Sequence, residues 1–162
     1  MPQISRMIDL DIFDRRILAA LQQDGRMTSV ALGEVVHLSA SQCARRVQRL
    51  EEAGIIRSYR AVLDPAALNL GIAGIVSLSL EKHAMANIQE LQRQIVQQPA
   101  IVECLSVTGE ADYQLRVVAR DLREFSALLM EAIVPMPGVS TMHSSIILDE
   151  VKPFAALPIA EG

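Results

Sequence analysis

The sequence contains no tryptophan, and only three phenylalanines and two tyrosines among its 162 residues. Aromatic platforms that stack nucleic-acid bases are therefore not expected. Cysteine is also scarce, because Cys43 and Cys104 lie far apart with no CxxC or Cys/His spacing around them. This pattern excludes both a zinc-ligand set and a disulfide framework.

A long hydrophobic run is missing as well. The longest uncharged apolar stretch, residues 65–80, contains two glycines and two serines, and it is shorter than the roughly 18 to 20 residues of a membrane-spanning helix. Residues 1–14 alternate acidic and apolar side chains, unlike a secretory signal. Because 51% of the residues are apolar and 21% are charged, disorder is excluded. We expect a globular, cytoplasmic protein with no membrane partner.

Charge is distributed unevenly along the chain. Residues 1–62 contain nine basic residues, all arginine, against seven acids, whereas residues 63–162 contain six bases against twelve acids. Five arginines fall between residues 41 and 60, so this stretch is basic within a chain of net charge -4. Such a stretch indicates either a solvated helix face or a surface that meets nucleic acid.

The first 54 residues predict three short helices. Apolar residues at helical spacing behind Asp11 predict a helix over residues 12–23, and Thr28 is placed to cap a second helix that ends near residue 36. Ser39 and Gln42 have the spacing of a capping box, which predicts a third helix that continues to residue 53. Residues 55–63 are interpreted as an extended ribbon that ends at an Asp-Pro pair.

The two faces of the third helix differ in chemistry. At about 100° per residue, Cys43, Val47 and Leu50 point to one side. The other side is polar and consists of Ser41, Gln42, Arg45, Arg46, Gln48, Arg49 and Glu52. Glutamine and arginine form paired hydrogen bonds with base edges, and further arginines bind phosphates. The pattern therefore fits a helix-turn-helix that binds DNA, although any packed helical hairpin has similar spacing.

The second half of the chain alternates between strand and helix patterns. Strands are expected over residues 71–81, 101–108, 111–120 and 139–151, with helices from Met85 to Pro99 and from Asp121 to Pro135. The order βαββαβ is that of a ferredoxin-like, split βαβ domain. The helices cover one face of such a sheet. Because Ile75 and Ile147 are expected on the other face, we infer that another subunit covers it.

Several segments together resemble one family, the Lrp/AsnC or feast/famine transcription factors. The similar segments are LDIFDRRILAALQQDGRMT (residues 10–28), LSASQCARRVQRLEEAGIIRSYRAVLDP (38–65), VTGEADYQLRV (107–117), PGV (137–139) and ILDEVK (147–152). The resemblance implies an α+β protein with a winged helix-turn-helix over residues 1–63 and a ferredoxin-like effector-binding and oligomerisation domain over residues 64–162. It also implies a DNA-binding transcription regulator that responds to a free amino acid, and a homodimer that assembles further, for example into an octamer.

The resemblance assigns roles to residues at matching positions. The DNA-binding set comprises Ser39, Ser41, Gln42, Arg45, Arg46 and Arg49 on the third helix, with Arg57 and Arg60 on the wing. The effector-binding set comprises Thr108, Gly109, Glu110, Ala111, Asp112 and Tyr113, together with Leu122, Ser145, Ile146 and Ile147. We hypothesise that backbone amides at Gly109 hold the carboxylate of the amino acid and that Asp112 holds its ammonium group. The alternative is that Gly109 and Asp112 are ordinary turn residues.

Two other functions remain open at this stage. Sirohaem decarboxylases resemble the family in both domains, but the only histidines here are His37, His83 and His143, and no GxSxG, Walker, HExxH or dinucleotide motif occurs. We therefore expect no enzyme, no metal and no cofactor. The third possibility is an architectural DNA-binding protein with little sequence preference. The chain also departs from the family at His37, where glycine is usual, and at Ala111, where some members have an aromatic residue.

Overall fold

The computed structural model describes residues 9–81, 87–153 and 156–160. The chain forms two compact units, one comprising Met1–Val62 with Lys152–Gly162 and the other Leu63–Val151. The sequence-based division at residues 63 and 64 lies one residue from the first of these boundaries. The C-terminal segment differs, because it groups with the first unit through the hydrogen bonds that residues 157 and 160 form there.

The first unit is built from three helices. They are α1 (Ile12–Gln23), α2 (Ser29–Val36) and α3 (Ala40–Glu52). The side chains of Asp11, Thr28 and Ser39 cap them by accepting from backbone amides of the first turn, as the sequence predicts. The core between them consists of Ile17, Ala20, Leu32, Val36, Cys43 and Leu50.

The turn between α2 and α3 is tight. His37 caps α2 in the left-handed conformation, with φ 59° and ψ 46°, so a residue that is not glycine occupies a conformation that glycine adopts more readily. Gly33 of α2 also allows this turn, because the backbone of the turn passes close to its Cα. A Cβ on Gly33 would lie 2.5 Å from the carbonyl oxygen of Leu38, so only a residue without a side chain allows this approach of the backbones.

Residues 57–64 form no strand in the part of the chain that the structure describes. The expected ribbon is instead an extended linker (residues 55–63), because a strand needs a hydrogen-bonded neighbour and this segment has none among the described residues of its own unit. A single turn of 3-10 helix, Ala66–Leu68, follows it in the second unit.

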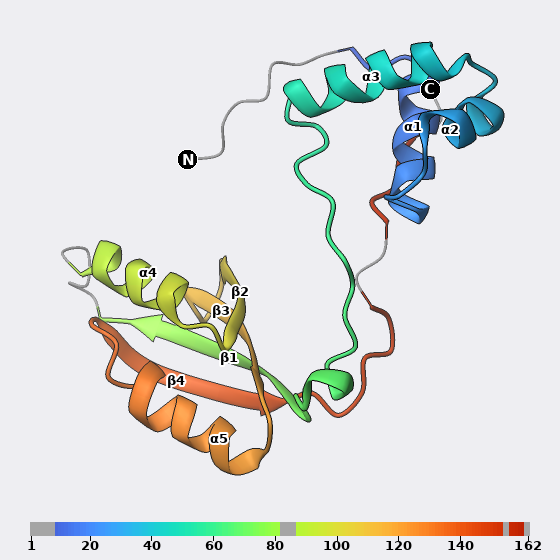
Figure 1. Cartoon of the computed structure of the whole chain (residues 1–162). Coiled ribbons are helices and arrows are strands. Elements are labelled where there is room, and N and C mark those ends of the chain that lie inside the picture. Colours follow the sequence, from blue (N-terminus) through green and yellow to red (C-terminus); the bar gives the residue numbers. More distant parts are fainter. Residues whose placement is uncertain (1–8, 82–86, 154–155, 161–162) are drawn as a thin grey trace. The chain divides into compact units, whose positions relative to one another are not determined.

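The second unit has the predicted βαββαβ order. Its elements are β1 (Ile72–Leu80), α4 (Ile88–Gln97), β2 (Ile101–Ser106), β3 (Tyr113–Ala119), α5 (Leu122–Ala127) with a π-helical continuation over Leu128–Ile133, and β4 (Val139–Ile146). The strands form one antiparallel sheet in the order β2-β3-β1-β4 (Figure 1). The α+β fold class with a ferredoxin-like second domain is therefore confirmed.

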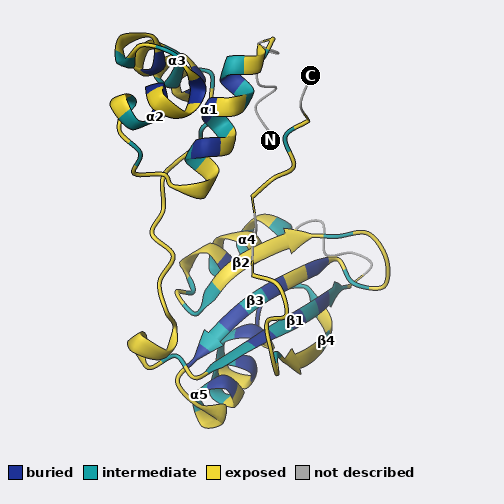
Figure 2. Ribbon diagram, turned by 90° about the vertical axis from the view of Figure 1, so that its right-hand side faces the viewer, coloured by how far each residue is buried: buried dark blue, intermediate teal, exposed yellow. Residues whose placement is uncertain are grey.

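One face of this sheet is covered by α4 and α5, and no helix in the described residues of this unit lies over the other face (Figure 2). Alternating apolar residues at positions 113, 115, 117 and 119 predict a period of two in β3. The structure confirms it, since Tyr113, Leu115, Val117 and Ala119 are all buried. They pack with Val76 and Leu78 of β1, Leu91 and Ile95 of α4, and Phe125, Leu129 and Ile133 of the α5 segment.

Helical spacing predicts that Leu122, Phe125 and Leu129 share one apolar side of the α5 segment. Phe125 and Leu129 are buried, but Leu122 is 60% exposed, so the prediction is wrong for this residue. It lies about 60° around the helix from Phe125, at the edge of the buried stripe. The last strand also ends at Ile146 and not at residue 151. Met85 and His83, which the sequence analysis named, lie outside the described residues.

Candidate DNA-binding and effector sites

The capping box at the start of α3 holds the first polar side chains of the DNA-binding set. Gln42 Oε1 accepts from the backbone N–H of Ser39 at 3.1 Å, and the Gln42 backbone N–H donates to Ser39 Oγ at 3.3 Å. Ser39 Oγ and Ser41 Oγ lie 3.1 Å apart. All three residues are exposed. The amide oxygen of Gln42 is therefore committed to the cap, while its NH₂ group takes no part in these bonds.

The three arginines of α3 have different surroundings. Arg46 Nη1 donates to Asp11 Oδ2 at 2.7 Å and to Asp14 Oδ1 at 2.8 Å, and its guanidinium lies 5.5 Å from the centroid of the Phe13 ring. Arg49 Nη2 donates to Asp14 Oδ2 at 2.5 Å. Among the residues that the structure describes, Arg45 forms no such ion pair and is exposed.

Asp14 is the centre of this arrangement, because its side chain is fully buried. We define Asp11, Asp14, Arg46 and Arg49 as the α1–α3 ion cluster. Burial opposes ionisation of Asp11, but the hydrogen bonds from the Asp14 backbone and from Arg46 outweigh it and lower the pKa of Asp11. The hydrogen bond to Asp11 raises the pKa of Arg46. The cluster thus fixes α3 against α1, a role that the sequence analysis missed because it placed Arg46 on the outward side of α3.

The linker carries the remaining residues of the DNA-binding set. Arg57 and Arg60 are exposed. Between them, the hydroxyl of Tyr59 donates to Glu51 Oε1 on α3 at 2.9 Å. Burial and this carboxylate together raise the pKa of Tyr59 to about 12. Tyr59 therefore attaches the middle of the linker to the end of α3.

The loop between β2 and β3 is tied to the end of β1. Asp112 Oδ2 accepts from the backbone N–H of Leu80 at 2.7 Å, and Ser79 Oγ donates to the carbonyl of Glu110 at 3.0 Å. Gly109, at the tip, has φ 123°. This is a left-handed conformation that side-chain-bearing residues rarely adopt. One oxygen of Asp112 is thus used to hold the loop, a contact that residue spacing does not reveal.

A hollow of about 730 Å³ opens beside this loop, on the sheet face without helices. Three predicted effector residues line it, namely Thr108, Glu110 and Ala111. The other lining residues are Ser77 and Ser79 of β1, Gln114 of β3, Thr141 and His143 of β4, and Val107. The strand register accounts for them, since Ser77 is paired with both Gln114 and His143 and these three side chains share one face. Their positions depend on the strand pairing, which no short motif encodes.

The rest of the predicted effector set does not line this hollow. Tyr113 faces the core, where its hydroxyl accepts from Gln92 Nε2 of α4 at 3.0 Å. Ser145 is on the helix-free face, paired with Ile75, and Ile146 is paired with Gly74. Ile147 follows the end of β4, and its backbone N–H donates to the carbonyl of Ala73 on β1 at 2.8 Å.

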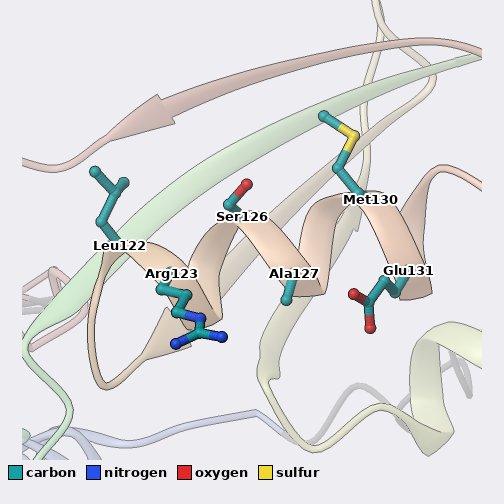
Figure 3. Close-up of a pocket in the computed structure, with 6 residues that line it drawn as sticks. All are labelled: Leu122, Arg123, Ser126, Ala127, Met130 and Glu131. Carbon is teal, nitrogen blue, oxygen red and sulfur yellow. The ribbon is translucent and has the colours of Figure 1, made fainter.

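Leu122 lines a separate surface hollow of about 680 Å³ along α5 and its π-helical continuation. Figure 3 shows Leu122, Ser126 and Met130 in succession along one side of this helix, with Arg123 and Glu131 beside them. The predicted effector residues therefore fall into at least two separate places on the second unit.

Neither a metal site nor a membrane span is found in the described parts of the chain. Of these residues, no three histidine, cysteine, aspartate or glutamate side chains gather in a way that could hold a metal ion. None of the helices described is long and apolar enough to cross a membrane.

Comparison with known proteins matches two family models to the chain. Residues 10–51 match the AsnC-type helix-turn-helix domain, and residues 73–157 match the Lrp/AsnC ligand binding domain. A leucine-responsive regulatory protein of Rhizobium meliloti is 37% identical over 90% of this chain and 93% of its own length. A Bkd operon transcriptional regulator of Pseudomonas aeruginosa is 39% identical over 94% of this chain and its whole length.

Solved structures agree with these relatives. A transcriptional regulator from Neisseria meningitidis, in complex with L-Met, superposes with a TM-score of 0.88 at 37% identity, covering 93% of this chain and 97% of its own. An AsnC family regulator from Agrobacterium tumefaciens superposes with a TM-score of 0.84 at 31% identity over 91% and 96% of the two chains. The relatives are transcriptional regulators and not enzymes. With both of its units matched in order, the chain belongs to the Lrp/AsnC family of transcriptional regulators.

Proposed function

We propose that α3 enters the major groove of duplex DNA, with Ser41, Gln42 and Arg45 facing base edges. The observation that carries this proposal is the separation of the two faces of α3. Cys43 and Leu50 are fully buried, whereas Ser41, Gln42 and Arg45 are exposed. The free NH₂ group of Gln42 and the guanidinium of Arg45 have the donors that base recognition in the major groove uses.

The other basic residues divide into two roles in this proposal. Arg49, Arg57 and Arg60 are exposed and contact phosphates, which fixes the register of the protein on the duplex. Arg46 side-chain exposure is only 23%, and its hydrogen bonds go to Asp11 and Asp14. We therefore assign Arg46 to holding α3 in place, and Ser39 to the helix cap, although the sequence grouped both with the DNA contacts.

We further propose that the second unit binds a free amino acid in the hollow beside the β2–β3 loop. The complex of the Neisseria meningitidis relative with L-Met supports an amino acid as the class of ligand. Glu110 lines the hollow and Asp112 does not, so Glu110 is the better partner for the ammonium group. Backbone amides near Gly109, with Thr108 and His143, are available to the carboxylate.

The helix-free sheet face supports a homodimer, and a larger assembly such as an octamer. Leu105, paired with Gln114, is 48% exposed in the isolated chain, and Ile75 and Val118 also lie on this face. A second subunit would cover these apolar side chains. The effector then regulates only if it binds one assembly more tightly than another. Because the proposed partner is chromosomal DNA, we place the protein in the cytoplasm.

The test of DNA recognition compares Gln42→Ala with Gln48→Ala, in fluorescence anisotropy against one upstream duplex and a random duplex at fixed salt. Gln48 is a matched control, since its Nε2 donates to Glu52 at 2.8 Å on the same helix. We expect Gln42→Ala to lower the specificity ratio at one base position, by about 1 to 3 kcal/mol of discrimination. Equal affinity of the unmodified chain for both duplexes would instead indicate an architectural protein with little preference.

The test of effector binding is a thermal-shift screen of the twenty amino acids, followed by sedimentation of the protein with and without each hit. A ligand at about 100 times its Kd stabilises the unit that binds it by about 2.7 kcal/mol. We expect Glu110→Gln to abolish the shift. A screen in which no amino acid stabilises the protein would contradict the proposed ligand class.

A further inference from the structure

The C-terminal residues of the chain lie against α1 of the first unit. Gln22 on α1 holds one residue of this segment with both ends of its carboxamide. Gln22 Nε2 donates to the carbonyl of Leu157 at 3.0 Å, and the N–H of Leu157 donates to Gln22 Oε1 at 2.6 Å. About two turns earlier on α1, Arg15 Nη1 donates to the carbonyl of Ala160 at 3.2 Å.

These contacts recognise the backbone of the segment and not its side chains. The N–H and C=O of one extended residue point to the same side, so a carboxamide can pair with both as a neighbouring strand does. Pro158 restricts the preceding residue, Leu157, to extended backbone. Proline also has no N–H of its own, so the segment gains this shape without leaving a donor unpaired at that position. Leu157 is 66% exposed, which agrees with recognition through the main chain.

A groove of about 780 Å³ accompanies the contact. Leu18 and Leu21 of α1 and Ile55 and Ile56 of the linker line it, and residues 156–159 close it from the other side. Leu18, Leu21, Ile55 and Ile56 are each partly buried against the core of the first unit. The surface thus offers apolar contact along its floor and two polar anchors, Gln22 and Arg15, along its edge.

We propose that this groove, with Gln22 and Arg15, is a docking site for the C-terminal segment of the same chain. The first unit is then connected to the second at two points, because the chain leaves it after Val62 and returns at Lys152. The return path starts at the end of β4, at Ile146. A change in the position of that strand end would therefore reach α1 through the docked segment, independently of the linker.

The test measures hydrogen exchange of the Leu157 amide in the full-length protein, resolved by fragmentation of the C-terminal peptide. We expect exchange about tenfold slower in the unmodified chain than in Gln22→Ala, the effect of one or two net hydrogen bonds. Gln23→Ala is the matched control, because Gln23 is the exposed neighbour of Gln22 on α1 and makes neither contact with Leu157. Fast exchange in the unmodified chain, or equal exchange in both variants, would overturn the docking site.

A cross-linking experiment decides whose segment docks. Leu21→Cys and Leu157→Cys are combined with Cys104→Ser, which removes the exposed native thiol while Cys43 stays buried. Gln22 is unchanged in this triple variant, so its hydrogen bonds to the backbone of residue 157 can still form. With a short bismaleimide we expect a link within one chain, seen as a joined peptide in a band of monomer size. A covalent dimer would show that the groove takes the segment of a second copy, and no link at all would refute docking. Neither experiment needs DNA or effector, so their outcome is separate from that of the proposed function.

Discussion

Replacing Asp14 by asparagine removes the charge at the centre of the α1–α3 ion cluster while keeping the size of the side chain. Asp14 is fully buried, but its partners Arg46 and Arg49 keep 23% and 44% of their side-chain surface exposed. Breaking a fully buried ion pair costs about 3 to 5 kcal/mol, whereas an exposed pair contributes about 0 to 1 kcal/mol. Because the guanidinium groups can turn to water and the carboxylate cannot, we expect Asp14→Asn to destabilise the first unit by about 2 to 3 kcal/mol.

The assay has to report on the first unit alone, because a chain of two units does not unfold in a single two-state step. Native-state hydrogen exchange in a urea series does this peptide by peptide. Peptides from α1, α2 and α3 should exchange about 30- to 150-fold faster in Asp14→Asn. Peptides from β1 and β3 serve as the internal reference and should not change.

The matched control is Asp11→Asn in the same cluster. Asp11 is 48% exposed and accepts from Arg46, and it also caps α1 through the backbone N–H of Asp14. Asparagine caps a helix about as well as aspartate, so only the exposed ion pair is lost, and we expect less than about 1 kcal/mol. If both variants accelerate exchange equally, burial of Asp14 does not set the strength of the cluster and the reasoning is wrong.

Three further predictions follow from backbone geometry. Gly33→Ala should destabilise the first unit by about 1 to 2 kcal/mol, since the clash with the Leu38 carbonyl outweighs the gain in helix propensity; unchanged exchange of α2 peptides would contradict it. His37→Gly should stabilise the same unit by about 0.5 kcal/mol, because it relieves the left-handed conformation at the cost of a freer unfolded chain; exchange of α2 and α3 peptides measures this gain, and faster exchange would disprove it. Gly109→Val should abolish the amino-acid thermal shift and leave DNA anisotropy unchanged. We attribute this loss to the φ of 123° at Gly109 and not to crowding, since no heavy atom lies within 4 Å of a Cβ added there. A retained thermal shift in Gly109→Val would refute this prediction.

Local sequence signals predicted most of the fold. The Ser39–Gln42 capping box, the periodicity of β3 and the βαββαβ order all depend on residues close together in the chain, and the structure agrees with each. The linker shows where such signals stop. Its extended pattern predicts a ribbon, but a strand exists only where a second strand pairs with it, and that depends on long-range contact.

The candidate sites were harder to predict for the same reason. Helical periodicity placed Arg46 on the outward side of α3, and it could not show that Asp11 and Asp14 of another helix would hold its guanidinium. Likewise, the motif around Gly109 predicts an effector loop, while Ser77 and His143 reach the hollow beside that loop only through the register of β1 and β4. Sequence thus predicted which elements to inspect for function, and tertiary pairing decided which of their side chains lie together.

Two residues of the proposed DNA-binding surface have one polar atom committed to the fold and another left free. Gln42 uses Oε1 in the α3 cap, and Arg49 uses Nη2 to bind Asp14. Each side chain is therefore already restricted before any ligand arrives. Ordering a free side chain of this kind on binding costs about 0.5 to 1.5 kcal/mol. Because the fold has already met part of that cost, these residues combine a structural role with a prepared contact, and substituting either of them should affect stability and binding together.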